Sequence, residues 1–172
     1  MNTSILSLEE TEQFQKIHDH FIPKRKKAFQ TKFVKGRKAY EKSAPILNKA
    51  LSVLKENNIT NINKKTSYIE FHKRNSGFEK KDFGNWFSWH KDDYGAVPWP
   101  CYSVIFYLRK DHTLKGGNLQ YKLDGEEHTV PITNRTILQF KGNIEHCPEP
   151  TTGFGCRDII VVFIKRTEKS KK

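Results

Sequence analysis

Hydrophobic positions along the chain change their spacing about one third of the way from the N-terminus. Before that point, residues 7–21 place apolar side chains at helical spacing, and Ser7 with Glu10 forms a capping-box pattern at their start. Residues 43–58 show the pattern of a second amphipathic helix, with Pro45 in its first turn. The N-terminal third is therefore predicted to be helical.

Beyond this point, apolar and polar residues alternate with a period of two, which is typical of half-buried strands. Turn signals such as Gly116-Gly117 and Asp124-Gly125 separate the runs. The predicted strands are 66–71, 85–92, 102–109, 117–123, 127–132, 135–140 and 158–165. Short strands that follow helices predict an α+β fold, in which a jelly roll or sandwich of strands carries the helices on one face of a sheet.

The length of 172 residues suits one domain with a hydrophobic core of its own. We expect residues 1–60 to form a helical support region and residues 61–166 to form the β-sheet core. The last six residues, 167–172, read as a solvated basic tail. No internal repeat and no linker interrupts this order.

Charge adds a preference for anionic partners. The chain has 31 Lys and Arg against 19 Asp and Glu, a formal net charge of +12. Nucleic acid, an acidic protein and a small carboxylate all fit this charge, and it does not choose among them. The basic segment 24–42 has two interpretations, a solvated helix face or a surface for an anionic polymer.

The cysteines predict a reducing compartment. Cys101, Cys147 and Cys156 are odd in number and lack CxxC spacing, which argues against a disulfide framework. The N-terminus shows no signal-peptide pattern, and no apolar run approaches the roughly 20 residues that span a membrane. We therefore expect no membrane partner and a cytoplasmic location, or the host cytoplasm if the source is a virus.

The first candidate metal ligands lie in the stretch NWFSWHKDDYG, residues 85–95. In an extended strand His90 and Asp92 point to the same face, so an imidazole and a carboxylate can bind a divalent ion from one side. His146, between the run 135–140 and a turn, is the best candidate for a third ligand. Two histidines and one carboxylate suit non-haem Fe(II). The alternative is a charged strand end beside a hydrophobic core.

Arg157 is the second candidate for a functional role. It begins the run RDIIVVFIK, whose two faces are both apolar, so the strand is predicted to be buried. A buried guanidinium requires an anion, and a carboxylate that accepts two hydrogen bonds is its natural partner. The alternative is an ordinary surface arginine at a strand end.

Other residues gave weaker signals. His18 and His20 lie two apart on a predicted helix and do not face each other, so we expect no metal site formed by this pair. His72 is a candidate for approaching a substrate. Trp86, Trp89 and Trp99 are interpreted either as walls of a pocket or as core residues.

In this order, His90-x-Asp92, SVIFYLRKD, GGNLQY, His146 and Arg157 resemble the 2-oxoglutarate and Fe(II)-dependent oxygenases, in particular their prolyl-4-hydroxylase-like branch. The resemblance covers roughly residues 68 to 165. It implies a double-stranded β-helix, a cupin-like jelly roll, with the N-terminal helices packed on one sheet. It implies His90, Asp92 and His146 as catalytic iron ligands. Arg157 would pair with the distal carboxylate of 2-oxoglutarate, and Tyr107 would hydrogen-bond to that carboxylate.

The resemblance further implies a dioxygenase that uses Fe(II), 2-oxoglutarate and O2, with ascorbate as an accessory reductant. Oxidative decarboxylation of 2-oxoglutarate to succinate would be coupled to hydroxylation of a protein or peptide, most plausibly at proline. Three alternatives stay open: a nucleic-acid oxygenase or demethylase, favoured by the net charge, a small-molecule hydroxylase, and a jelly-roll binding module without iron.

Overall fold

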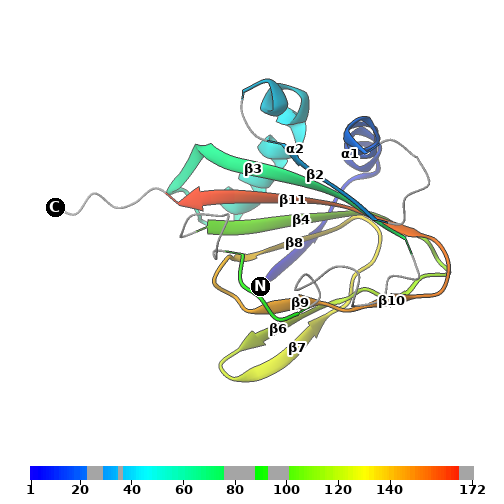
Figure 1. Cartoon of the computed structure of the whole chain (residues 1–172). Coiled ribbons are helices and arrows are strands. Elements are labelled where there is room, and N and C mark those ends of the chain that lie inside the picture. Colours follow the sequence, from blue (N-terminus) through cyan, green and yellow to red (C-terminus); the bar gives the residue numbers. More distant parts are fainter. Residues whose placement is uncertain (23–28, 35–36, 76–87, 93–100, 167–172) are drawn as a thin grey trace.

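The computed structural model describes residues 1–22, 29–34, 37–75, 88–92 and 101–166. Within these ranges the chain forms two helices and antiparallel sheets (Figure 1). The elements are β1 (Asn2–Ile5), α1 (Leu8–Phe21), β2 (Phe29–Val34), α2 (Arg37–Glu56), β3 (Ile62–Asn75), β4 (Cys101–Lys110), β5 (Lys115–Gly116), β6 (Leu119–Leu123), β7 (Glu126–Val130), β8 (Thr136–Lys141), β9 (His146–Pro148), β10 (Thr151–Thr152) and β11 (Cys156–Arg166).

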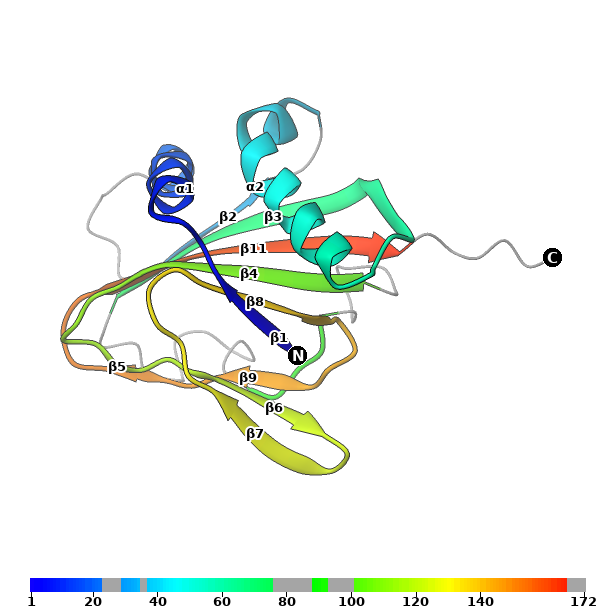
Figure 2. The same cartoon turned by 180° about the vertical axis from the view of Figure 1, so that it is seen from behind.

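The strands form one large sheet and two small ones. The large sheet has the order β1-β8-β4-β11-β3-β2, and all of its neighbouring strands are antiparallel. Both helices cover one face of this sheet, and the small sheets β7-β6-β9 and β10-β5 face its other side (Figures 1 and 2). The fold is thus a largely antiparallel β structure with its helices on one outer face, as the sequence predicts.

The central strands are buried on both faces, and their side chains alternate between two cores. On β4, Val104 and Phe106 belong to the core under the helices, whereas Ile105 and Tyr107 belong to the core between the sheets. The predicted strand 158–165 has the same alternation within β11. Each fully buried aliphatic or aromatic side chain contributes about 1.5–3 kcal/mol, so these two strands anchor the fold.

Helix α1 begins where the sequence predicts. Ser7 Oγ accepts a hydrogen bond from the Glu10 backbone N–H at 3.0 Å, and Glu10 Oε2 accepts one from the Ser7 N–H at 2.9 Å. This capping box satisfies two backbone donors that would otherwise lack partners. Phe14 then packs edge-on against Phe106, with 5.3 Å between ring centroids, which fixes the helix on the large sheet.

The N-terminal third differs from its prediction in two ways. Strands β1 and β2 also lie within residues 1–60, where only helices are predicted, and they form the two edges of the large sheet. Helix α2 begins at Arg37, so Pro45 lies inside the helix and not in its first turn. Within the basic segment 24–42, part of the backbone is therefore strand, and the side chains of residues 24–40 lie outside the described residues.

The predicted strand 85–92 is described only from Ser88 onward. Here His90 forms an isolated antiparallel bridge with His146, with 2.9 Å between backbone nitrogen and oxygen in both directions. Trp86, Trp99 and the tail lie outside the described residues.

The three cysteines are buried, and no disulfide joins them within the described residues. Neither described helix has the length and apolar character needed to cross a membrane.

Candidate metal and cosubstrate site

A pocket lies between the large sheet and the small sheets and brings together most of the residues singled out in the sequence. Its empty space is about 570 Å³ when the open solvent at its mouth is included. The described residues that line it are Glu70, His72, His90, Asp92, Ile105, Tyr107, Leu119, His146, Pro148, Arg157, Ile159, Val161 and Phe163. Trp89 is not among them.

Three ligand-type side chains converge in this pocket. His90 Nε2 lies 3.8 Å from Asp92 Oδ1, and His146 Nε2 lies 3.6 Å from the same oxygen. One ligand atom from each of the three residues lies within 4.8 Å of the other two. Zinc and similar ions bind nitrogen and oxygen at about 2.0–2.2 Å, so small adjustments bring all three donors to one ion.

Backbone hydrogen bonds orient both imidazole rings. His90 Nδ1–H donates to the Ser88 carbonyl at 2.8 Å, and His146 Nδ1–H donates to the Ile144 carbonyl at 3.0 Å. In a neutral ring, a protonated Nδ1 leaves the lone pair on Nε2, the atom that faces Asp92. Such backbone contacts are the usual second-shell support of metal-binding histidines.

Electrostatics favour the neutral form of His146. Burial lowers the pKa of His146, and the nearby Asp92 charge opposes that shift while His90 adds to it. A neutral imidazole is the form that binds a metal. Asp92 is held in turn by Ser103, whose hydroxyl donates to Asp92 Oδ2. The two carboxylate oxygens therefore have different surroundings, and Oδ1 faces the histidines.

Arg157 also lines the pocket. The prediction that it is buried is confirmed, because the residue is only 2% exposed. Its Nη1 donates to the Gly117 carbonyl at 2.5 Å, whereas its buried Nε has no hydrogen-bond partner. The Tyr107 ring lies 6.0 Å from the guanidinium carbon. Burial raises the pKa of Tyr107 to about 12, so its phenol stays a hydrogen-bond donor at neutral pH.

The predicted Gly116-Gly117 turn positions Arg157. Both glycines have positive φ, +72° and +76°, which side chains other than glycine rarely adopt. A Cβ on Gly117 would lie 2.6 Å from Arg157 Nη1. The glycine therefore leaves the space that the guanidinium occupies.

The pocket contains the donor atoms that Fe(II) and 2-oxoglutarate require. Two imidazole Nε2 atoms and one carboxylate on one side of a centre form the donor set of a non-haem Fe(II) site with open positions. A buried guanidinium with an unused Nε–H, beside a neutral phenol, provides donors for a carboxylate. The residues present fit both Fe(II) and 2-oxoglutarate.

Glu70 and Ser103 were not among the predicted site residues, and His72 was only a candidate. Glu70 is buried on β3 and accepts a hydrogen bond from His72 Nε2 at 2.9 Å, so the candidate His72 does lie in the pocket. The signal for Glu70 was a carboxylate on an apolar strand. Ser103 shares the parity of Tyr107 on β4, and its hydrogen bond to Asp92 requires the fold to bring residues 92 and 103 together.

Comparison with solved structures finds the same fold in several enzymes. A prolyl-4-hydroxylase from Pseudomonas putida is similar with a TM-score of 0.65 and 14% identity, over 96% of this chain and 91% of that one. A prolyl hydroxylase from Trichoplax adhaerens, in complex with a hypoxia-inducible-factor oxygen degradation domain peptide fragment, gives 0.65 and 12%, over 95% and 83%. A 2-oxoglutarate and Fe(II) oxygenase family oxidoreductase from Burkholderia pseudomallei gives 0.70 and 12%, over 95% and 84%.

At the level of sequence, no protein-family model and no curated protein matches the chain. The likeness therefore rests on three-dimensional structure and extends over nearly the whole chain. The chain has the fold of the 2-oxoglutarate and Fe(II) oxygenases, including prolyl-4-hydroxylases, which is the resemblance that its sequence indicates.

Proposed function

We propose that this protein is a 2-oxoglutarate- and Fe(II)-dependent dioxygenase that hydroxylates a protein or peptide substrate at proline. The observation that carries the proposal is the convergence of His90, Asp92 and His146 in a pocket that the buried Arg157 also lines. A fold alone does not determine function, so the argument rests on these side chains.

Each of these residues has a defined role in this proposal. His90, Asp92 and His146 hold Fe(II), which when bound supplies the redox chemistry that couples decarboxylation of 2-oxoglutarate to hydroxylation. Arg157 and Tyr107 bind the distal carboxylate and so orient the keto acid toward the metal ligands. The apolar side chains of the pocket wall exclude water and strengthen these polar contacts.

The division of the chain follows from the same proposal. Residues 61–166 would form the double-stranded β-helix that carries the site, and residues 1–60 would support it within one domain of 172 residues. The helices pack on the face of the large sheet opposite to the pocket, so they brace the strands without lining the site.

A turnover assay tests the proposed reaction. Purified protein with Fe(II), ascorbate and 2-oxoglutarate should form succinate even without a primary substrate, and Asp92→Ala and His146→Ala should abolish this. His128→Ala is a matched control, because that imidazole stacks on Tyr121 and does not line the pocket. Succinate formation that survives in both ligand variants would remove the metal assignment.

The substrate class needs a second comparison. The Trichoplax neighbour binds a peptide, which supports a peptide substrate, whereas the net charge of +12 favours nucleic acid. Proline-rich peptides and methylated oligonucleotides should therefore be tested side by side. A peptide that gains one oxygen atom with matched succinate formation supports the proposal, and demethylation of the oligonucleotide instead would favour the alternative.

A further inference from the structure

A second cluster of ligand-type side chains lies on the opposite face of the large sheet, between α1 and β11. His18 and Asp19 belong to α1. Asp158 belongs to β11, where it directly follows Arg157. One ligand atom from each lies within 4.8 Å of the other two. None of the three lines the pocket described above, so this cluster is a separate site.

The hydrogen bonding of His18 leaves a buried lone pair. Its Nε2–H donates to the His72 carbonyl at 2.9 Å, because a carbonyl oxygen can only accept. The Nδ1 atom of the neutral ring therefore carries the lone pair. This atom is buried without a hydrogen-bond partner, and it lies 3.7 Å from Asp19 Oδ1, too far for a hydrogen bond. A lone pair and a carboxylate that face each other repel unless a cation lies between them.

Asp158 contributes a second unsatisfied atom. The residue is 2% exposed and its Oδ1 has no hydrogen-bond partner. Arg109 stands opposite Asp158 in the strand register, but its guanidinium bonds to Asp111, at 2.8 and 3.1 Å. A buried carboxylate is costly unless a charge or a metal compensates it.

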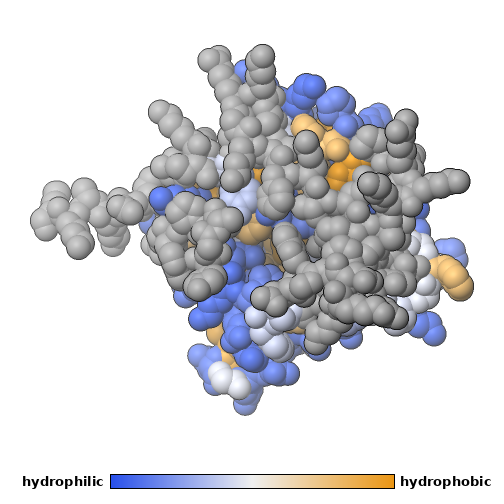
Figure 3. Space-filling model, in the orientation of Figure 1, coloured by the Kyte–Doolittle hydropathy of each residue, from blue (hydrophilic) through white to orange (hydrophobic). Residues whose placement is uncertain are grey.

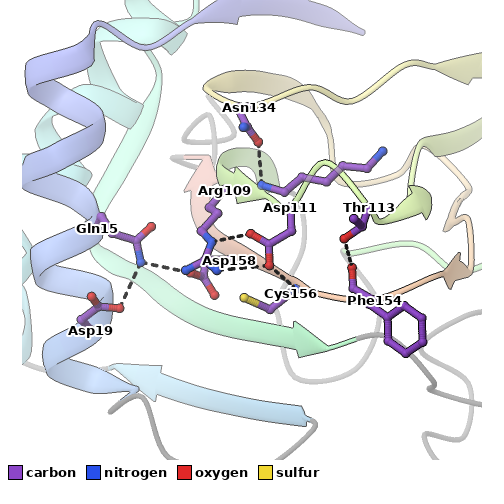
Figure 4. Close-up of polar contacts among 10 residues, drawn as sticks. Gln15, Asp19, Arg109, Asp111, Thr113, Asn134, Phe154, Cys156 and Asp158 are labelled. Atoms are coloured by element: carbon purple, nitrogen blue, oxygen red, sulfur yellow. Dashed lines mark hydrogen bonds and ion pairs between the residues drawn. The ribbon is translucent and has the colours of Figure 1, made fainter.

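Gln15 holds the two carboxylates in place. Its side-chain Nε2 donates to Asp19 Oδ1 at 3.0 Å and to Asp158 Oδ2 at 3.1 Å, as Figure 4 shows. The amide thus bridges the helix and the strand and leaves Asp158 Oδ1 unused. An amide that orients two carboxylates, together with a backbone carbonyl that orients a histidine, has the form of second-shell support around a metal.

We propose that His18 Nδ1, Asp19 and Asp158 bind a divalent transition-metal ion of the zinc type, which fastens α1 to β11. One nitrogen and two carboxylate donors are typical zinc ligands, and the imidazole disfavours magnesium and calcium. The Asp19 side chain is 30% exposed, so an ion can enter and keep water on that side. Ligand atoms in a tetrahedral zinc site lie roughly 3.4 Å apart, so from separations within 4.8 Å the side chains need to close by up to about 1.4 Å.

The site lies directly behind the pocket. His18 bonds to the backbone of His72, whose side chain lines the pocket, and Asp158 follows Arg157 in the same strand. An ion bound here would fix β3 and β11 on the face of the large sheet that packs against α1. Its binding does not depend on the proposed oxygenase reaction.

Zinc stoichiometry tests the proposal in a background without the pocket ligands. The Asp92→Ala/His146→Ala variant, stripped with a chelator, should still bind one equivalent of Zn(II) by calorimetry and by metal analysis after dialysis. Adding His18→Gln or Asp158→Asn should remove that equivalent. His20→Gln and Asp124→Asn are controls, since both residues lie outside the cluster, and each should leave the zinc bound.

The melting temperature provides a second readout. Zn(II) should raise the melting temperature of the background variant and of both controls, and should leave it unchanged after His18→Gln. Circular dichroism checks that each variant is folded, and His18→Gln and Asp158→Asn serve as independent tests if one of them is not. Absence of bound zinc in the background variant, or full binding after both substitutions, would overturn the proposal and indicate a buried imidazolium instead.

Discussion

Arg157 Nη1 donates to the Gly117 carbonyl at 2.5 Å, and a Cβ on Gly117 would lie 2.6 Å from that same nitrogen. The position of the guanidinium thus depends on the absence of a side chain at residue 117, as well as on the backbone carbonyl that accepts its hydrogen bond. The two residues lie on different segments, the turn before β6 and the start of β11. Their contact sets where a carboxylate can meet Arg157.

Gly117→Ala should therefore weaken binding of 2-oxoglutarate by about tenfold or more, a cost of about 1.4 kcal/mol or above. The methyl group would displace the guanidinium. Calorimetric titration of the keto acid into the Fe(II)-loaded protein without oxygen measures the effect. Gly125→Ala is the control, because Gly125 also has positive φ, +88°, but a Cβ there meets nothing within 4 Å. Equal losses in both variants would attribute the effect to backbone strain.

Arg157→Ala should raise the dissociation constant of 2-oxoglutarate by about 30-fold or more, since truncating a buried charged partner costs about 2–5 kcal/mol. Turnover at saturating keto acid should fall less than affinity does. Arg109→Ala is the matched control, because its guanidinium bonds to Asp111 and lies outside the pocket. An unchanged dissociation constant in Arg157→Ala would show that the cosubstrate binds elsewhere.

Ser103→Ala should lower the affinity for Fe(II) or Co(II) by about 10–100-fold, the usual effect of losing a second-shell partner. The hydroxyl holds Asp92 Oδ2 and leaves Oδ1 to face the histidines. Metal titration without oxygen measures this. Ser43→Ala removes another buried hydroxyl, one without a hydrogen-bond partner and in the helix layer, and should leave metal affinity unchanged. A similar loss in both variants would contradict the assigned role of Ser103.

Asp111 predicts a pH dependence of stability. The hydrogen bonds from Arg109 hold the pKa of Asp111 below its usual value, against the opposing effect of partial burial. A lowered folded-state pKa contributes stability above the unfolded value of about 3.9, and this is lost as pH falls through the folded value. Asp111→Asn should therefore cost about 0.5–1 kcal/mol at pH 7 and less at about pH 3.

Urea unfolding of wild type and Asp111→Asn at the two pH values measures the difference. Asp124→Asn is the control, since Asp124 occupies a left-handed turn position, φ 52°, that Asn also tolerates. Its effect should be near zero at both pH values. A cost for Asp111→Asn that grows as the pH falls would contradict the predicted sign.

The sequence predicted the strands whose side chains alternate against two cores, because burial on both faces leaves a readable pattern. Ser103 and Tyr107 share one face of β4, and the structure places Tyr107 in the pocket wall and Ser103 against Asp92. Strand β1 was missed because all four of its residues are exposed, and it is held by backbone pairing to β8.

The cluster of His18, Asp19 and Asp158 behind the pocket also could not be predicted from the sequence. The pair His18 and His20 was the visible feature, and the structure combines His18 with Asp19 and with Asp158 from the far end of the chain. Such a combination depends on how α1 packs on β11, so the spacing of residues along the sequence does not indicate it. The distances at the metal ligands likewise depend on the bridge between His90 and His146.

Titration of 2-oxoglutarate without oxygen, into metal-free and Fe(II)-loaded protein, tests the central assignment most directly. If the three ligands and Arg157 bind the two ends of one keto acid, loading with Fe(II) should tighten 2-oxoglutarate binding by about tenfold or more, and His146→Ala should lose this gain. Equal affinity with and without Fe(II), or a gain that persists in His146→Ala, would contradict the account.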